Sequence, residues 1–148
     1  MDLIRIDVTD LKRFDRELRA LESTDFERGL QPTLYAFAAV EAGRIRNRYR
    51  ETYPQRSGNA VSTITPQATG KGASIQFNSA RYPYVAGQEF GSNKYRQFFP
   101  WTGPGPAGAG SQGRFVYPQL REDRDELVQG ITDRVMEIAG RAFPERLL

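Results

Sequence analysis

The chain has 148 residues, a formal net charge of +3, and neither cysteine nor histidine. Its length fits one domain, and a hydrophobic content of 39% is typical of folded rather than disordered chains. The missing residue types exclude disulfides, thiolate nucleophiles, the usual zinc sites and proton transfer by histidine. No apolar stretch approaches the roughly 20 residues that a membrane helix needs, and the N-terminus lacks a signal-peptide core, so a soluble intracellular product without a membrane partner is expected.

The charge of the chain is unevenly distributed, with the positive surplus in residues 41–118 and a net negative charge at both ends. This segregation indicates a face that meets phosphate or an acidic neighbour. The alternative is compositional, because a GC-rich genome also raises the share of arginine over lysine.

The first part of the chain predicts two short elements. Residues 3–8 alternate between apolar and charged side chains, which is typical of a half-buried strand or of an extended arm. Apolar residues then recur at steps of three and four from Leu11 to Leu21, behind Thr9 or Asp10 as a helix cap. That spacing predicts an amphipathic helix, which ends in the polar residues 23–29.

A second helix is predicted from Pro32 to Thr52, because proline suits the first turn, where its missing N–H needs no partner. Residues 33–40 are apolar almost all round and therefore need cover from neighbouring elements or from another subunit. Leu34, Phe37 and Ala38 begin a stripe that is predicted to be buried, and Ile45 and Tyr49 continue it in the second half of the helix.

Beyond Pro54 the pattern changes to that of strands. Residues 60–65 and 73–78 predict two strands, joined by a hairpin at residues 70–72. Residues 82–90 predict a third strand, which is aromatic and ends at a glycine.

The last third of the chain contains a loop and a helix. Residues 102–113 consist almost wholly of glycine, proline, alanine and serine, a composition that predicts a flexible loop. Residues 114–117 predict a short strand, and residues 118–142 predict the final helix. These elements together predict an α+β fold for a single domain of residues 1–148, with N-terminal helices, a small and mostly antiparallel sheet, and the C-terminal helix packed on the sheet.

Two features bear on cofactors and catalysis. Residues 103–108 have the glycine spacing of a dinucleotide fingerprint, but their prolines lack N–H donors and no helix follows, so no cofactor is predicted. Glu41, Glu51 and Glu89 are candidates for acid chemistry, because burial raises the pKa of a carboxyl group. Pairing of Glu41 with an arginine one turn away is the simpler expectation. A small hydrolase would require a clustered pair of acids, which the sequence does not show, and no enzymatic activity is predicted.

The arginine cluster of the second helix is the clearest electrostatic feature. Arg44 with Arg48, and Arg46 with Arg50, are four residues apart and so form two adjacent polar flanks. They predict a surface that faces DNA or an acidic partner. The alternative is a solvated helix end, whose cations face the negative end of the helix dipole and need no partner.

Aromatic side chains are concentrated in residues 82–101. Tyrosine and tryptophan beside glycine and proline are typical of subunit interfaces, although a small domain also uses aromatic residues in its core. Together with the apolar half of the second helix, they predict subunit contacts at five residues: Phe37, Tyr82, Tyr84, Phe90 and Trp101.

Three local patterns resemble the head-to-tail joining proteins of tailed bacteriophages, the neck or tail-completion family. In that family a long helix leads through a short Thr/Ser-Gly step into the sheet, as residues 56–61 do here. A tyrosine-containing strand then ends in Glu-aromatic-Gly-Thr/Ser, which residues 82–92 match. An Arg-Pro-Phe-like strand precedes a proline that opens the last helix, similar to residues 114–120. The similarity covers residues 30–142, and it departs from the family pattern at Gly87-Gln88 and in the long segment 95–113.

The resemblance implies a structural subunit of the virion that is assembled in the host bacterial cytoplasm. Its expected partners are further copies of itself in a sixfold or twelvefold ring, the neighbouring connector and tail-tube proteins, and packaged DNA by non-specific contact. A closed ring would also cover apolar surfaces that a chain of this size cannot bury alone. The alternative is a nucleic-acid-binding module that uses the arginine-rich end of the second helix, for which salt-dependent affinity for duplex DNA is diagnostic.

Overall fold

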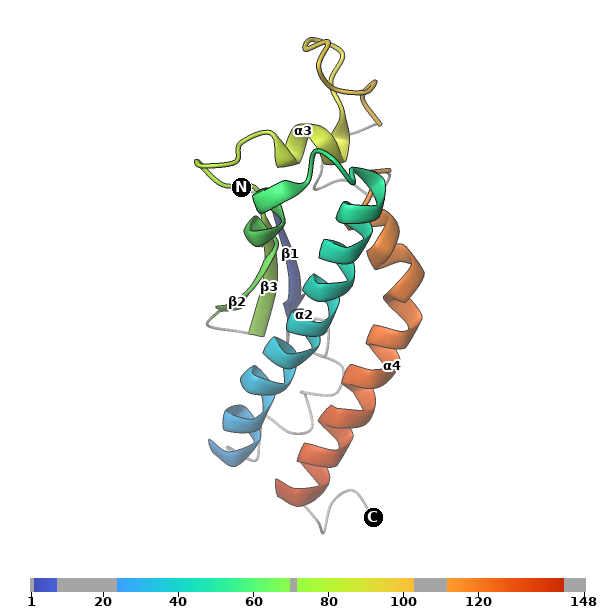
Figure 1. The fold of residues 1–148 in the computed structure, drawn as a ribbon. Coiled ribbons are helices and arrows are strands. Elements are labelled where there is room, and N and C mark those ends of the chain that lie inside the picture. Colours follow the sequence, from blue (N-terminus) through green and yellow to red (C-terminus); the bar gives the residue numbers. More distant parts are fainter. Residues whose placement is uncertain (1, 8–23, 70–71, 103–111, 143–148) are drawn as a thin grey trace.

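The computed structural model of the protein describes residues 2–7, 24–69, 72–102 and 112–142. Its elements are strand β1 (Asp2–Asp7), helix α2 (Thr24–Thr52), the 3-10 helix η3 (Gly58–Thr63), strands β2 (Thr65–Thr69) and β3 (Gly72–Phe77), and helices α3 (Val85–Phe90) and α4 (Val116–Ala142). The predicted α+β fold is confirmed (Figure 1). The helix predicted between Leu11 and Leu21 and most of the loop predicted at 102–113 lie outside the described residues.

The sheet has the strand order β1-β3-β2, and both pairs of strands are antiparallel. Ile75 of the central strand pairs with Ile4 on one side and with Pro66 on the other. Proline lacks an N–H donor, and an edge strand such as β2 is where a sheet tolerates it. The N-terminal segment, for which the sequence allowed a strand or an arm, is the edge strand β1.

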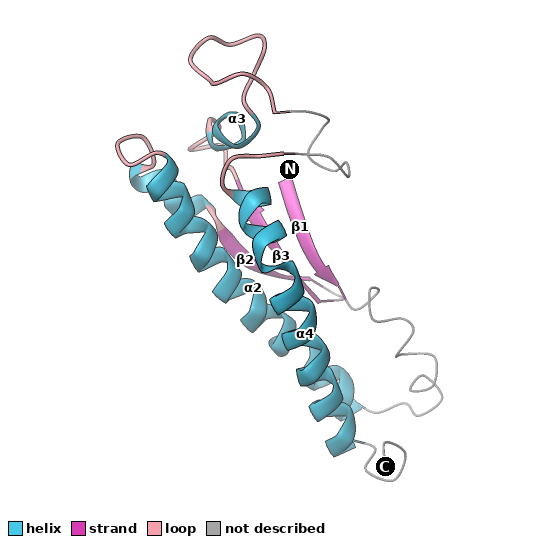
Figure 2. Ribbon diagram, turned by 90° about the vertical axis from the view of Figure 1, so that its right-hand side faces the viewer, coloured by secondary structure: helices cyan, strands magenta, loops and turns pink. Residues whose placement is uncertain are grey.

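Two long helices form a layer against this sheet. α2 makes the closest contacts with the strands, and α4 packs antiparallel along α2, so that the C-terminal helix completes the layer (Figure 1 and Figure 2). Glycines allow the two helices to approach each other. A Cβ atom at Gly29 would lie 3.0 Å from Cγ2 of Ile138, and one at Gly130 would lie 2.8 Å from Cε1 of Phe37.

The core lies between the sheet and the helices. Ala73, Ile75 and Phe77 point to one face of β3 and are buried, and Ser74 on the opposite face is buried as well, so this central strand is largely covered on both faces. The predicted stripe of α2 is also buried, and the ring of Tyr49 stacks on that of Phe115, with the two centroids 4.4 Å apart. Each large apolar side chain that is fully buried contributes roughly 1.5–3 kcal/mol of transfer free energy. The helical core residues are Leu34, Ala38, Ala42 and Ile45 of α2, and Ile131, Val135 and Ile138 of α4.

The start of α2 differs from the prediction. The helix begins at Thr24, and Pro32 lies inside it rather than in its first turn. The polar residues 23–29 were predicted to interrupt the helical pattern before Pro32, but residues 24–29 belong to α2, and Gly29 is a close-packing position against Ile138. The contact with α4 therefore outweighs the unfavourable local propensities of glycine and proline.

Three predicted strands are wrong in whole or in part. Residues 60–63 belong to the 3-10 helix η3, and the strand begins only at Thr65. Residues 82–90 form a turn followed by the helix α3 instead of an aromatic strand. Residues 114–117 lead directly into α4, which begins at Val116. The strand predicted at residues 73–78 is confirmed as β3.

Candidate interaction surface

The carboxylate of Glu89 joins α3 to the start of α4. Its Oε1 accepts the backbone N–H of Arg114, its Oε2 accepts that of Val116, both at 2.5 Å, and Oε1 also accepts the N–H of Phe115 at 3.3 Å. These N–H groups have no partner within the helix, so a carboxylate from another element acts as their cap. Burial raises the pKa of Glu89, while the same N–H groups act to lower it. This candidate acid is therefore a structural residue.

Gly113 makes the approach of Glu89 possible. Its φ of +61° lies in the left-handed region, and a Cβ atom there would stand 1.9 Å from Oε1 of Glu89. Only glycine meets both conditions without a shift of the backbone or of the carboxylate.

Residues 91–102 extend from α3 beyond the end of the long helices (Figure 1). Two backbone hydrogen bonds close this segment, from Ser92 N–H to the carbonyl of Phe99 at 2.9 Å and from Thr102 N–H to that of Phe90 at 2.8 Å. The guanidinium of Arg114 donates to the carbonyl of Pro100 at 2.6 Å. The segment is thus a hydrogen-bonded loop that is anchored at the start of α4.

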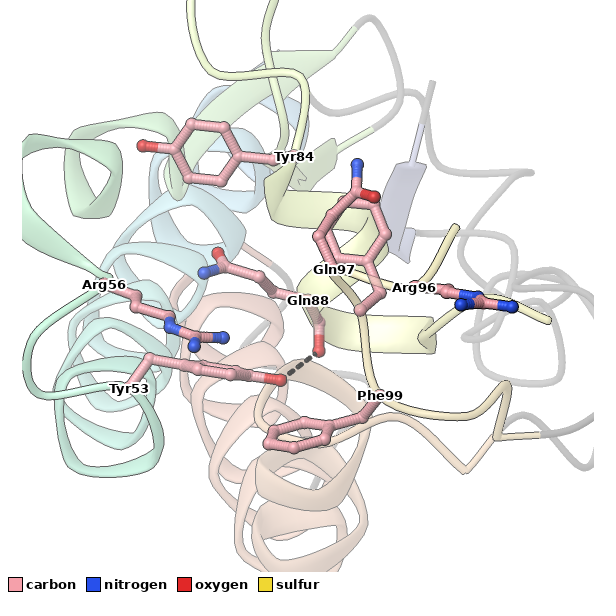
Figure 3. Close-up of a pocket in the computed structure, with 8 residues that line it drawn as sticks. Tyr53, Arg56, Tyr84, Gln88, Arg96, Gln97 and Phe99 are labelled. Carbon is pink, nitrogen blue, oxygen red and sulfur yellow. Dashed lines mark hydrogen bonds between the residues drawn. The ribbon is translucent and has the colours of Figure 1, made fainter. Parts of the chain in front are cut away.

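A hollow of about 630 Å³ opens between this loop, α3 and the end of α2 (Figure 3). Aromatic side chains form much of its wall, and amide and guanidinium groups occupy its floor and rim. The lining residues are Tyr53, Arg56, Tyr84, Gln88, Arg96, Gln97, Phe98 and Phe99.

Gln88 stands at the centre of the hollow and is held from two sides. The hydroxyl of Tyr53 donates to its backbone carbonyl at 2.8 Å, and the hydroxyl of Tyr49 donates to its side-chain Oε1. The preceding Gly87 packs on the ring of Phe98, where a Cβ atom would come within 2.5 Å of Cζ. These contacts fix Gln88 of α3, and the loop that carries Phe98, relative to the end of α2.

The predicted subunit contacts fall into two groups. Tyr84 and Trp101 lie at this end of the molecule and are 37% and 47% exposed. Tyr82 and Phe37 are half-buried, and Phe37 lies against Gly130 of α4. Phe90 is a correction, because only 8% of it is exposed and its ring contacts those of Phe77 and Tyr117 in the subunit's own core. Two further exposed residues of the predicted aromatic concentration belong to the same end but were not among the five predicted contacts: Tyr95 and Phe99.

The arginines of α2 mostly bind groups of the same chain. Arg44 donates to both carboxylate oxygens of Glu126 at 3.0 and 2.9 Å, and Arg48 donates to Glu122 at 2.7 Å. Arg46 donates to the carbonyl of Ile64 at 2.7 Å. Arg50 is exposed and donates to Asn47, its own helical neighbour. The first flank, Arg44 with Arg48, therefore faces the acidic side of α4.

A pair of buried acids lies beneath this flank and was missed in the sequence. Glu41 is fully buried and Asp123 nearly so, and Nη1 of Arg44 is 3.8 Å from Glu41 and 3.5 Å from Asp123. Neither oxygen of an ionised Glu41 has a hydrogen-bond donor. Burial, followed by the neighbouring carboxyl group of Asp123, raises the pKa of Glu41 to about 8, so that Glu41 keeps its proton at neutral pH. Glu41 of α2 and Asp123 of α4 are 82 positions apart in the sequence, so no local spacing pattern could have revealed the pair.

In residues 24–69, 72–102 and 112–142, no group of three or more acidic side chains is placed to hold a metal ion. Likewise, no helix in the described part of the chain has the length and apolar character needed to cross a bilayer. Comparison of the chain with protein-family models, with curated proteins and with solved structures found no match.

Proposed function

We propose that the protein is a structural virion subunit of a tailed bacteriophage, which forms a ring at the head-tail junction or at the head-proximal end of the tail. The observation that carries this proposal is the exposed aromatic end of the subunit. Four large aromatic side chains are exposed at this end, and two of them, Tyr84 and Phe99, line the hollow. Aromatic side chains stabilise a protein when they are buried, so their exposure calls for a partner. A neighbouring copy would cover them. The residues of this aromatic end are Tyr84, Tyr95, Phe99 and Trp101.

A ring requires two different contact surfaces on each subunit, because its contacts are head-to-tail. The second surface is offered by the long helices, where large apolar side chains are also exposed. Tyr35 and Val40 are exposed on α2, and Val128 and Met136 on α4. The apolar half of α2 was expected to need cover from neighbouring elements or from another subunit, and Tyr35 and Val40 are its large apolar side chains that remain exposed.

The state of the carboxyl groups supports a structural rather than a catalytic role. Glu89 is occupied with capping α4, and Glu41 is enclosed between α2 and α4, away from any substrate. Glu51 is exposed at the end of α2. A general acid or base must reach the proton that it transfers, and neither buried carboxyl group does so.

The nucleic-acid-binding module stands second. Its basis was the arginine cluster of α2, but Arg44, Arg46 and Arg48 donate to groups of the chain itself. Phosphate would have to displace these partners, whereas exposed, unpaired arginines bind phosphate without that cost. Arg50 is the member of the cluster that is open to DNA.

Native mass spectrometry of the purified protein, alone and with tail-tube subunits, tests the ring. Trp101→Ala and Tyr84→Ala are expected to weaken assembly by the roughly 2 kcal/mol typical of interface hot spots. Gln55→Ala, an exposed polar position near the hollow, is the control and should assemble as wild type does. Arg46→Glu with Arg50→Glu should leave the ring formed. A wild type that stays monomeric under every condition would overturn the proposal.

A further inference from the structure

We infer that the hollow binds an extended, acidic polypeptide segment of a neighbouring virion subunit. The inference rests on the proposed function, because it assigns a partner to the aromatic end on which that function depends. Its basis is a set of hydrogen-bond donors that have no acceptor among the described residues.

The first of these donors is the side-chain amide of Gln88. The residue is only 6% exposed, and its Oε1 is already taken by the hydroxyl of Tyr49. Its Nε2 donates to no group in the described chain, and the amide points into the space between Tyr84 and Arg56 (Figure 3). Water reaches this Nε2 in the free protein, and a ligand that supplies an acceptor would take the place of that water.

Two guanidinium groups add positive charge to the hollow. Arg56 reaches from the end of α2 toward the centre, whereas Arg96 stands at the opposite rim and points outward (Figure 3). Neither makes a hydrogen bond or an ion pair with the described residues. The lining contains no acidic side chain. The hollow therefore complements an anion that accepts hydrogen bonds, and a carboxylate fits the fork of an arginine.

The walls favour a polypeptide over a nucleic acid. Tyr53 and Phe99 stack with their centroids 6.1 Å apart, and with Tyr84 they form an apolar lining beside the donors. A volume of about 630 Å³ lies within the range of ordinary ligand pockets and accommodates a few side chains. A nucleic-acid strand needs a basic path that follows its backbone, whereas here two isolated arginines lie on opposite sides of the hollow (Figure 3). An acidic side chain next to an apolar one matches the donors and the wall together.

The experiment is an NMR titration of the full chain with three probes. The first is a short synthetic peptide in which aspartate alternates with leucine, the second has asparagine in place of aspartate, and the third is an oligothymidylate of equal length. The observed signals are the side-chain amide of Gln88 and the Nε–H of Arg56. We expect saturable shifts of both with the aspartate peptide, and binding at least about tenfold weaker with the asparagine peptide, because an ion pair with a guanidinium is lost.

Arg56→Gln is the test variant, since this exposed side chain has no hydrogen bond or ion pair within the described part of the chain and can be changed without loss of the fold. It should weaken binding of the aspartate peptide about tenfold, the scale of one charge-assisted hydrogen bond. Arg124→Gln, an exposed arginine on α4 away from the hollow, is the matched control and should bind as wild type does.

No shift with any probe, equal binding of the two peptides, or an unaltered affinity in Arg56→Gln would each overturn the inference. Tighter binding of the oligothymidylate would do the same and would assign the hollow to single-stranded nucleic acid. Ring formation, measured separately by native mass spectrometry, distinguishes the two proposals. Rings without peptide binding reject only the inference, whereas peptide binding by a chain that never assembles rejects the proposed ring.

Discussion

Glu89 reaches from α3 to the first turn of α4 and thereby fixes two elements with one side chain. Its oxygens accept three consecutive backbone N–H groups, a density of hydrogen bonds that compensates for the burial of a carboxylate. Gly113 leaves the space that this contact needs. Single residues thus decide where the loop of residues 91–102 sits relative to the long helices.

Gly113→Ala is expected to destabilise the protein by about 1–3 kcal/mol, because alanine is strained at a positive φ and its Cβ would displace the Glu89 carboxylate. Gly140→Ala is the control, since that glycine lies within α4 with open space around it. Alanine there should be neutral or stabilising by up to about 1 kcal/mol. Urea unfolding of both variants measures the difference, and equal stabilities would show that Gly113 has no special role.

The pairing of α2 with α4 combines glycine contacts with an acidic cluster. Phe37 on Gly130 and Ile138 on Gly29 bring the two helices together. The acidic cluster surrounds Arg44, whose guanidinium lies within 4 Å of a carboxylate oxygen of each of three acids. Glu41 and Asp123 are buried, whereas Glu126 is exposed. One cation cannot compensate three anions in a buried site, so one of the acids keeps its proton.

The proton on Glu41 makes the stability of the protein depend on pH. Its pKa is raised to about 8 in the folded state, from an ordinary value of 4.5, so folding retains a proton that the unfolded chain releases between these values. The free energy of unfolding should therefore fall as pH rises through this window, by at most about 1.4 kcal/mol per pH unit from this group. Asp123, whose pKa is lowered, acts oppositely and contributes stability that is lost in acid. Urea unfolding between pH 5 and about 8 measures the slope.

Glu41→Gln removes the titrating group and keeps its shape, so the free energy of unfolding of this variant should depend less on pH. Its stability relative to wild type should therefore increase as pH rises. Glu51→Gln, an exposed position on the same helix, should keep the slope of wild type. If the free energies of unfolding of Glu41→Gln and wild type change in parallel with pH, Glu41 is ionised in the folded protein and does not keep its proton at neutral pH.

The long elements were predictable because their periods are repeated over many residues. The stripe of Leu34, Ala38, Ile45 and Tyr49 identified α2, and the alternation around Ile75 identified β3. The short elements were not predictable from the sequence. Residues 85–90 have buried positions at Val85, Gln88, Glu89 and Phe90, which is compatible with one face of a helix, but two of the four are polar. The alternating tyrosines before them suggested a strand instead.

The candidate site was predictable in its location but not in its composition. The concentration of aromatic residues in 82–101 marked the end of the molecule where Tyr84 and Trp101 are exposed. The lining of the hollow includes Arg56 and Gln88, which are far apart in the sequence. The hydrogen bond from Tyr53 to the carbonyl of Gln88, 35 positions along the chain, holds these two segments next to each other. The pairing of Arg44 with Glu126 across the helices is equally remote in sequence, and it turned the arginine flank away from an external partner.

At the scale of the whole molecule, the subunit has an aromatic end and a helical side with exposed apolar residues. These surfaces are distinct, as a head-to-tail ring requires, and the hollow at the aromatic end carries positive charge. The order of events in assembly depends on whether the aromatic end is covered by a second copy or only by a different subunit.

Trp101 reports directly on that end, because it is the only tryptophan of the chain and is 47% exposed in the single subunit. If assembly covers the aromatic end, its fluorescence emission should move to shorter wavelength, and acrylamide should quench it less, at concentrations where rings form. Tyr84→Ala serves as the control, because at the same concentration this variant should stay unassembled and keep the emission of the free subunit. Rings that native mass spectrometry detects while the emission and the quenching of Trp101 stay unchanged would show that copies meet elsewhere, and the exposed apolar residues of α2 and α4 would then be the contact between subunits.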